Sequence, residues 1–113
     1  MRKHITLLFL LFSFTALFSQ TTLKAKVIGI KDGDTVVVLD SLNNQITLRL
    51  AEVDCPEKSQ PFGTKAKQFT SDQIYLKTIK YVVTDTDRYG RSIAIIYYDV
   101  DNKYLSAEII KAG

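Results

Sequence analysis

Three segments with the composition of β-strands follow one another closely in the first half of the chain. They run over residues 23–30, 35–39 and 45–53. In the third segment, Ile46, Leu48 and Leu50 fall on one face because successive strand residues point to opposite sides. The two connecting segments are short and polar, so the sequence predicts an antiparallel meander that must curl or be covered.

The second half of the chain predicts helix, hairpin and helix. A loop over residues 54–62 contains both prolines, and residues 64–77 lack Gly and Pro. This segment is predicted to be a helix, with a modest apolar stripe that includes Phe69 and Leu76. Two β-rich runs, 79–84 and 93–98, flank a predicted hairpin turn, and residues 105–112 predict a final helix. The fold class is therefore α+β and mainly β.

Residues 1–20 are predicted to be a secretory signal peptide. Arg2 and Lys3 follow Met1, and residues 5–18 are apolar apart from Ser and Thr. This run is shorter than the ~20 residues of a membrane-spanning helix, although an uncleaved anchor is an alternative. We expect a secreted or periplasmic protein, with no stable membrane association after cleavage.

The part that remains, residues 21–113, suits one small domain. Its charge falls from the +3 of the whole chain to about +1, because the signal segment carries Arg2 and Lys3. Bulk charge is therefore weak evidence for nucleic-acid binding. The single Cys55 excludes an internal disulfide. It is also a poor candidate for a nucleophile, since the only histidine, His4, lies in the predicted signal.

Two aspartates lie where consecutive predicted strands reach one end of the sheet. Asp34 begins the second strand, within Asp32-Gly33-Asp34-Thr35, and Asp54 follows the third. Carboxylates are ligands of hard cations such as Ca²⁺, and Asp32 is placed to support them through water. For each aspartate taken singly, a solvated turn residue is the alternative, since Asp-Gly is a common turn dipeptide.

Two arginines and a glutamate complete a possible catalytic set. Arg49 interrupts an apolar strand, where a charge pointing inward would need a partner. Arg91 follows Gly90 in the predicted hairpin, and Arg can grip two phosphate oxygens at once. Glu57 follows Pro56 and is placed to take a proton from a water near a metal. The alternatives are ordinary surface charges.

The charges of this set balance. A divalent cation, the two aspartates, the two arginines, Glu57 and a phosphodiester monoanion carry no net charge together. The balance holds when the phosphoryl centre gains negative charge and Glu57 takes a proton. Such compensation is what electrostatic preorganisation requires.

At these residues the chain resembles the staphylococcal nuclease family. Three motifs carry the resemblance: Asp32-Gly33-Asp34-Thr35, Arg49-Leu50-Ala51-Glu52-Val53-Asp54-Cys55-Pro56-Glu57 and Tyr89-Gly90-Arg91. It covers residues 24–113 and implies an OB-fold, a five-stranded barrel with packed helices. In the family, a pocket tyrosine and a closing helix follow the position of Gly113, so we expect the domain to be incomplete at its C-terminus.

The resemblance also implies roles for individual residues. Ca²⁺ would be bound by Asp34, Asp54 and the backbone carbonyl of Cys55, with Asp32 in the outer shell. Glu57 would act as general base or position the water. Arg49 and Arg91 would bind the scissile phosphate, and Arg88 and Tyr89 would line the phosphate pocket.

The sequence therefore predicts an exported, calcium-dependent nuclease. It would hydrolyse DNA and RNA to 3′-phosphate ends, and we expect a monomer. One alternative is a noncatalytic OB-fold module that binds nucleic acid. Another is an inactive truncated fragment of the nuclease.

Overall fold

The computed structural model describes residues 20–57 and 59–113. The predicted signal peptide lies outside the described residues up to position 19. In the part of the chain that is described, no helix is long and apolar enough to cross a membrane.

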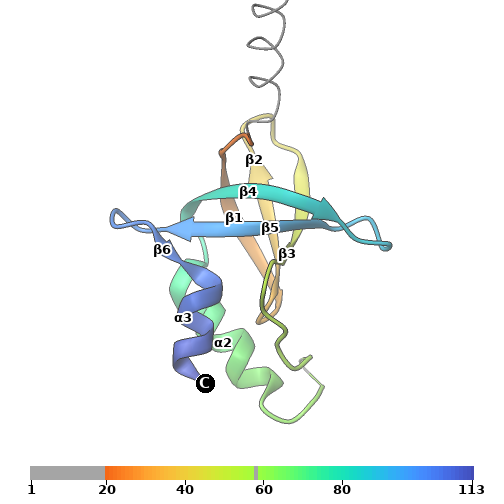
Figure 1. The fold of residues 1–113 in the computed structure, drawn as a ribbon, viewed down its shortest axis with the longest axis vertical. Helices are drawn as coiled ribbons and strands as arrows, with labels where there is room; N and C mark the ends of the chain where they lie inside the picture. The colour runs from red at the N-terminus through yellow and green to blue at the C-terminus, as the bar shows by residue number, and fades with distance from the viewer. Residues whose placement is uncertain (1–19, 58) are drawn as a thin grey trace, which may run out of the picture.

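Five strands form a closed barrel, as predicted. β1 (Leu23–Asp32), β2 (Thr35–Asp40) and β3 (Gln45–Leu50) form an antiparallel meander. β4 (Thr78–Thr86) and β5 (Ser92–Tyr98) form a hairpin that crosses this meander (Figure 1). β4 pairs with β1 antiparallel and β5 pairs with β3 in parallel, which closes the sheet. The two-residue β6 (Lys103–Tyr104) extends the edge of β5.

The interior of the barrel is apolar. Side chains from all five long strands meet there with Ile74 and Leu105 from the helices. The buried strand residues are Ala25, Val27, Val36, Val38, Leu48, Leu50, Ile79, Tyr81, Ala94, Ile96 and Tyr98. This core fixes the direction of each strand, so the polar residues at the strand ends are held by a rigid frame.

Two helices pack at one end of the barrel, α2 (Gly63–Ile74) and α3 (Leu105–Ala112) (Figure 1). The prediction that the first helix reaches residue 77 with Leu76 on its apolar stripe is wrong. Leu76 has a φ of 64° and is 55% exposed. The helix ends early because the N–H of Leu76 donates to the carbonyl of Val27, and the N–H of Val27 donates to the carbonyl of Lys77.

β3 also ends earlier than predicted, at Leu50 instead of Val53. Glu52 adopts a left-handed conformation with a φ of 66°, which turns the chain out of the sheet. The turn is held from two sides, because the N–H of Ala51 donates to Ala94 and the hydroxyl of Ser106 donates to the carbonyl of Ala51. The segment that follows is thereby directed toward the turn between β1 and β2.

Candidate active site

A tight turn between β1 and β2 positions the first carboxylates. Asp32 pairs with Thr35 across the hairpin, which leaves Gly33 and Asp34 as the two turn residues. Gly33 is packed closely against α2: a Cβ added there would lie 2.9 Å from the Cβ of Ala66 and 3.1 Å from its backbone carbonyl atoms. The hydroxyl of Thr70 donates to the carbonyl of Gly33 at 2.6 Å. These two contacts with α2 therefore fix the position of the turn relative to the helix.

Asp34 is buried, which is unusual for a turn residue. It is 5% exposed, and its Oδ2 accepts the backbone N–H of Cys55 at 2.8 Å. Its Oδ1 accepts the hydroxyl of Thr35 at 3.1 Å. The carbonyl of Asp34 also accepts the N–H of Leu50. A buried carboxylate needs such partners, and here most of them come from the end of β3 and the segment after it.

Arg49 joins the two acidic segments. Its Nη1 lies 3.3 Å from Oδ2 of Asp34, and its Nη2 donates to Oδ1 of Asp54 at 3.1 Å. The same Nη1 donates to the carbonyls of Leu50 and Val53 at 3.0 and 2.8 Å. The predicted need for a partner is therefore met by two carboxylates and two carbonyls, and the side chain is 21% exposed.

The predicted metal ligands are brought together in part. Asp34 and Asp54 converge on the same guanidinium, although the Asp54 side chain is 91% exposed while that of Asp34 is 7% exposed. Within residues 20–57 and 59–113, no three His, Cys, Asp or Glu side chains are grouped closely enough to hold a metal ion. The donors available are two carboxylates and neighbouring carbonyls, which suit a hard cation that completes its shell with water.

The thiol of Cys55 lies beside these charges. Burial is the main cause that raises its pKa, to about 11, and Asp34 adds to the shift while Arg49 opposes it. At neutral pH the thiol is therefore protonated and a weak nucleophile. This agrees with the expectation that Cys55 is a poor candidate for a nucleophile.

Arg91 has a partner that the sequence analysis missed. Its Nε donates to Oδ2 of Asp87 at 2.7 Å, and its backbone N–H donates to the other oxygen of the same carboxylate at 3.0 Å. Gly90, with a φ of 81°, allows the tight return that places these residues together. The signal in the sequence was an aspartate four residues before the arginine, on the other side of the Tyr89-Gly90 turn.

The pKa of Asp87 is set by this turn. Partial burial acts to raise it, but hydrogen bonds from the backbone and side chain of Arg91 and from the backbone of Tyr89 outweigh burial and lower the pKa of Asp87. The carboxylate is therefore charged at neutral pH and holds Arg91 in one orientation.

Tyr89 projects from the tip of the same hairpin. It is 70% exposed, and the guanidinium carbons of Arg88 and Arg91 lie 5.0 and 5.5 Å from its ring centroid. Arg88 also donates to the phenol oxygen of Tyr89. The predicted phosphate-pocket residues are thus in mutual contact and reachable from solvent.

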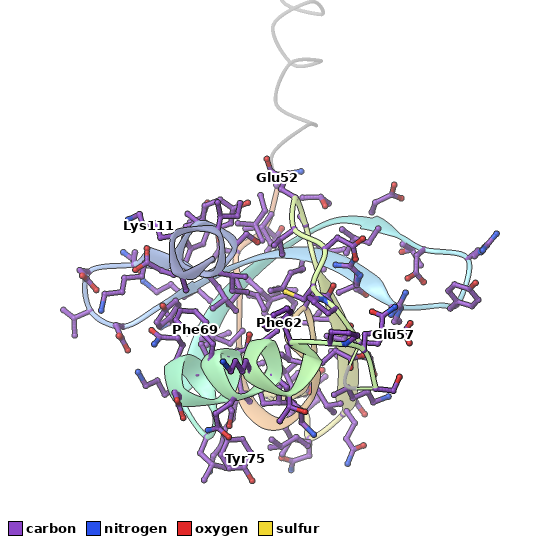
Figure 2. The ribbon with its side chains drawn as sticks, turned by 90° about the horizontal axis from the view of Figure 1, so that it is seen from below. Glu52, Glu57, Phe62, Phe69, Tyr75 and Lys111 are labelled. Carbon is purple, nitrogen blue, oxygen red and sulfur yellow. The ribbon has the colours of Figure 1, made fainter. Side chains whose placement is uncertain are left out.

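A cleft of about 790 Å³ gathers the remaining predicted residues. It is lined by Asp32, Glu57, Tyr89 and Arg91, together with Thr35, which bonds to Asp34. Figure 2 shows Glu57 on the side of the molecule where the β4–β5 hairpin projects. Asp54 lines a different hollow, between the segment after β3 and the two helices. The site therefore consists of an open cleft and a neighbouring ion cluster, in which Asp34 is buried and Asp54 is exposed.

Comparison with known proteins agrees with this architecture. Residues 47–113 match the family model described as staphylococcal nuclease homologue. An uncharacterized endonuclease of Haemophilus influenzae is 39% identical over 109 residues, which cover 96% of this chain and 60% of that protein. A micrococcal nuclease of Shigella flexneri is 39% identical over 75 residues, or 66% of this chain and 42% of that protein. An uncharacterized endonuclease of Escherichia coli O157:H7 is 31% identical over the whole chain, which covers 71% of that protein.

The chain spans about 60% of the length of the Haemophilus relative and less than half of the length of the Shigella one. The family model covers more than half of the chain, and the matched part includes β5, which closes the barrel by pairing with β3. This chain belongs to the family of staphylococcal nuclease homologues.

Proposed function

We propose that the chain is an exported nuclease that hydrolyses phosphodiester bonds of DNA and RNA with the help of Ca²⁺, leaving 3′-phosphate ends. The observation that carries the proposal is the convergence of Asp34 and Asp54 on Arg49, beside the cleft that Glu57 and Arg91 line together with Thr35, a hydrogen-bond partner of Asp34. The names of the Haemophilus and Shigella relatives, an endonuclease and a nuclease, support the reaction class.

The residues at this site offer the kind of ligand atoms that a calcium ion prefers. Asp34, Asp54 and the carbonyl of Cys55 would hold it, and Asp32 would contribute through water. All of these donors are oxygens, which is the preference of this cation. When bound, Ca²⁺ supplies positive charge that favours the developing charge on the phosphate.

Hydrogen bonds hold the side chain of Arg49 in place and leave some of its N–H groups available to bind a substrate. A guanidinium carries five N–H groups, and three of those of Arg49 point to Leu50, Val53 and Asp54. The two that remain, one on Nε and one on Nη2, have no other partner among the described residues. Because the side chain is fixed before substrate binds, it would lose little conformational entropy in binding a phosphate oxygen.

Arg91 is oriented in the same way by one carboxylate. Only its Nε is used by the Asp87 side chain, so the Nη1 and Nη2 groups are available at the cleft. Two arginines on neighbouring elements, Arg49 in β3 and Arg91 just before β5, can therefore approach one phosphate from two sides. Such fixed donors stabilise charge that develops in the transition state.

Glu57 is the candidate general base. It lines the cleft with Arg91 and follows the rigid Pro56. Its loop is held by a reciprocal pair of bonds, because the N–H of Glu57 donates to the Gln60 side chain and the N–H of Gln60 donates to the carbonyl of Glu57. A carboxylate held in this way can take the proton of an attacking water.

Export is proposed from the sequence of residues 1–20 alone. The basic start and the apolar run that follows are typical of a secretory signal. Expression of the full chain, followed by measurement of the N-terminus of the protein recovered outside the cytoplasm, tests this part. An N-terminus that still begins at Met1 would contradict it.

The reaction is tested by variants of the cleft residues. The rate of hydrolysis of a labelled single-stranded DNA should fall roughly 10²- to 10⁴-fold in Glu57→Gln, as expected for loss of a general base. It should fall by a similar order in Arg91→Ala, through loss of a transition-state donor. Glu108→Gln is the matched control, because Glu108 lies on α3 in a surface ion pair with Lys111. Unchanged rates in both cleft variants would overturn the assignment.

A further inference from the structure

A second hollow continues the cleft beyond Glu57. It has a volume of about 450 Å³ and shares Lys31, Asp32 and Glu57 with the larger cleft. Its far wall is formed by Lys67 on α2. The open surface therefore runs from the β4–β5 hairpin, past the candidate base, to the helix that packs under the Gly33 turn.

The two lysines of this hollow have no partner among residues 20–57 and 59–113. Neither Lys31 nor Lys67 makes a hydrogen bond or ion pair with another described residue. In contrast, Lys77, Lys103 and Lys111 are each bound to a carboxylate. Lys31 and Lys67 come from separate elements, β1 and α2, and yet line the same hollow. Their charges are therefore available to an anionic ligand.

The chemistry of the whole surface suits one extended strand. Tyr89 at one end offers an exposed ring on which an unpaired base can stack, and the lysines at the other end offer positive charge. Grooves that combine an aromatic platform with cationic residues along the backbone bind single-stranded nucleic acids. A substrate held only at the arginines would leave the Lys31 and Lys67 hollow unused.

We propose that Lys31 and Lys67 form a second backbone subsite, which binds phosphates of a single-stranded nucleic acid flanking the phosphate held by Arg49 and Arg91. This deepens the proposed function and rests on it: the preferred substrate is an oligonucleotide long enough to reach from Arg91 to Lys67. The lysines contact phosphates that are not cleaved, so they contribute to binding and not to the chemical step.

The test compares a long and a short substrate. In Lys31→Ala/Lys67→Ala, the KM for a dodecathymidylate should rise about fivefold per lysine at 0.1 M salt, as estimated from a counterion slope of ~0.7 per contact. The kcat for this substrate, and both constants for a thymidine dinucleotide, should stay at the wild-type values. Lys24→Ala/Lys26→Ala is the matched control, since both lysines are exposed on β1 and line neither hollow. Equal KM changes for the two substrates, or no change for either, would overturn the subsite.

A binding measurement separates this proposal from the proposed reaction. Fluorescence anisotropy of labelled dodecathymidylate in chelator, over a series of salt concentrations, should give a slope of log K against log salt that is smaller by ~1.4 in the double alanine variant. Lys31→Arg/Lys67→Arg should restore the wild-type slope. Absence of cleavage with this slope difference intact would reject the nuclease but keep the subsite. Wild-type protein that does not bind, or that shares the slope of the alanine variant, would reject the subsite.

Discussion

Gly33 is the residue whose replacement tests most sharply how the turn of Asp34 is held. An alanine Cβ at this position would lie 2.9 Å from the Cβ of Ala66, closer than two carbon atoms can pack, and 3.1 Å from the backbone C and O of the same residue. Since these atoms belong to α2 and not to a flexible side chain, the helix or the turn must move. Overpacking of this kind costs ~1 to 3 kcal/mol.

The expected net effect of Gly33→Ala is a loss of ~2 kcal/mol in the free energy of unfolding. The contact with backbone atoms favours the upper part of the overpacking range, and the reduced freedom of the unfolded chain returns ~0.4 to 1 kcal/mol. For a domain of this size, a loss of ~2 kcal/mol lowers the Tm by roughly 8 to 16 °C. The rate of DNA hydrolysis should also fall, because the turn carries Asp34 relative to Arg49.

Urea denaturation of four proteins measures this effect and its cause. Ala66→Gly alone should cost ~1 kcal/mol through helix propensity, and the double variant should be more stable than the sum of the two by at least ~0.5 kcal/mol. Gly29→Ala is the control on β1, the strand that precedes the turn, since its Cβ would meet Val37 at an ordinary 3.6 Å. Stability of Gly33→Ala within ~0.5 kcal/mol of wild type, or strict additivity in the cycle, would refute the reasoning.

Three further predictions concern other contacts of the site and core. Because the pKa of Asp87 is lowered in the folded protein, its ionised carboxylate stabilises the fold at pH values above the ordinary pKa of 3.8, and this contribution is lost as pH falls through the lower folded pKa. Thermal melts of Asp87→Asn should therefore depend less on pH below about 4 than those of the wild type. The hydrolysis rate of this variant should also fall, because Arg91 is no longer oriented. Ser106→Ala leaves the buried carbonyl of Ala51 without its donor, so urea denaturation should show a loss of ~1 to 3 kcal/mol. Burial first, then nearby carboxylates, raises the pKa of Tyr98 from 10.0 to about 12; wild type should lose stability as pH rises between these values, and Tyr98→Phe should not. The first account would be contradicted if the Tm of Asp87→Asn fell more steeply with acid pH than that of the wild type. The second would be contradicted if Ser106→Ala left the free energy of unfolding unchanged, and the third if Tyr98→Phe and wild type lost stability equally at alkaline pH.

The barrel could be predicted from the sequence because its signals are local. Alternation, polar turns and β-branched residues identify strands within short windows, and the three motifs place the candidate site residues near strand ends. The segment Asp32-Gly33-Asp34-Thr35 forms the turn that its Asp-Gly dipeptide indicates, but Asp34 is buried and is not the solvated turn residue that the sequence left open as an alternative. It is a two-residue hairpin turn, and its Asp34 is also a buried partner of Arg49.

The parts that could not be predicted depend on contacts between distant segments. Nothing near Gly33 in the sequence indicates that Thr70 hydrogen-bonds to it or that Ala66 packs closely against it. The end of α2 is likewise set by pairing of Leu76 with Val27, which lies far away in the chain. The role of Asp87 was missed for another reason, because an acidic residue in a hairpin turn is usually solvated and only the geometry of the turn makes it a partner of Arg91.

The central claim is that the Asp34, Asp54 and Arg49 cluster works with Ca²⁺ in the hydrolysis of nucleic acids. It is tested most directly by the rate at which the full chain cleaves end-labelled single-stranded DNA in calcium, in chelator, and in chelator followed by excess calcium. The account predicts cleavage in calcium, a rate at the background level in chelator, full recovery when calcium returns, and products with 3′-phosphate ends. Cleavage that proceeds equally in chelator, or no cleavage by folded protein at any calcium concentration, would contradict it.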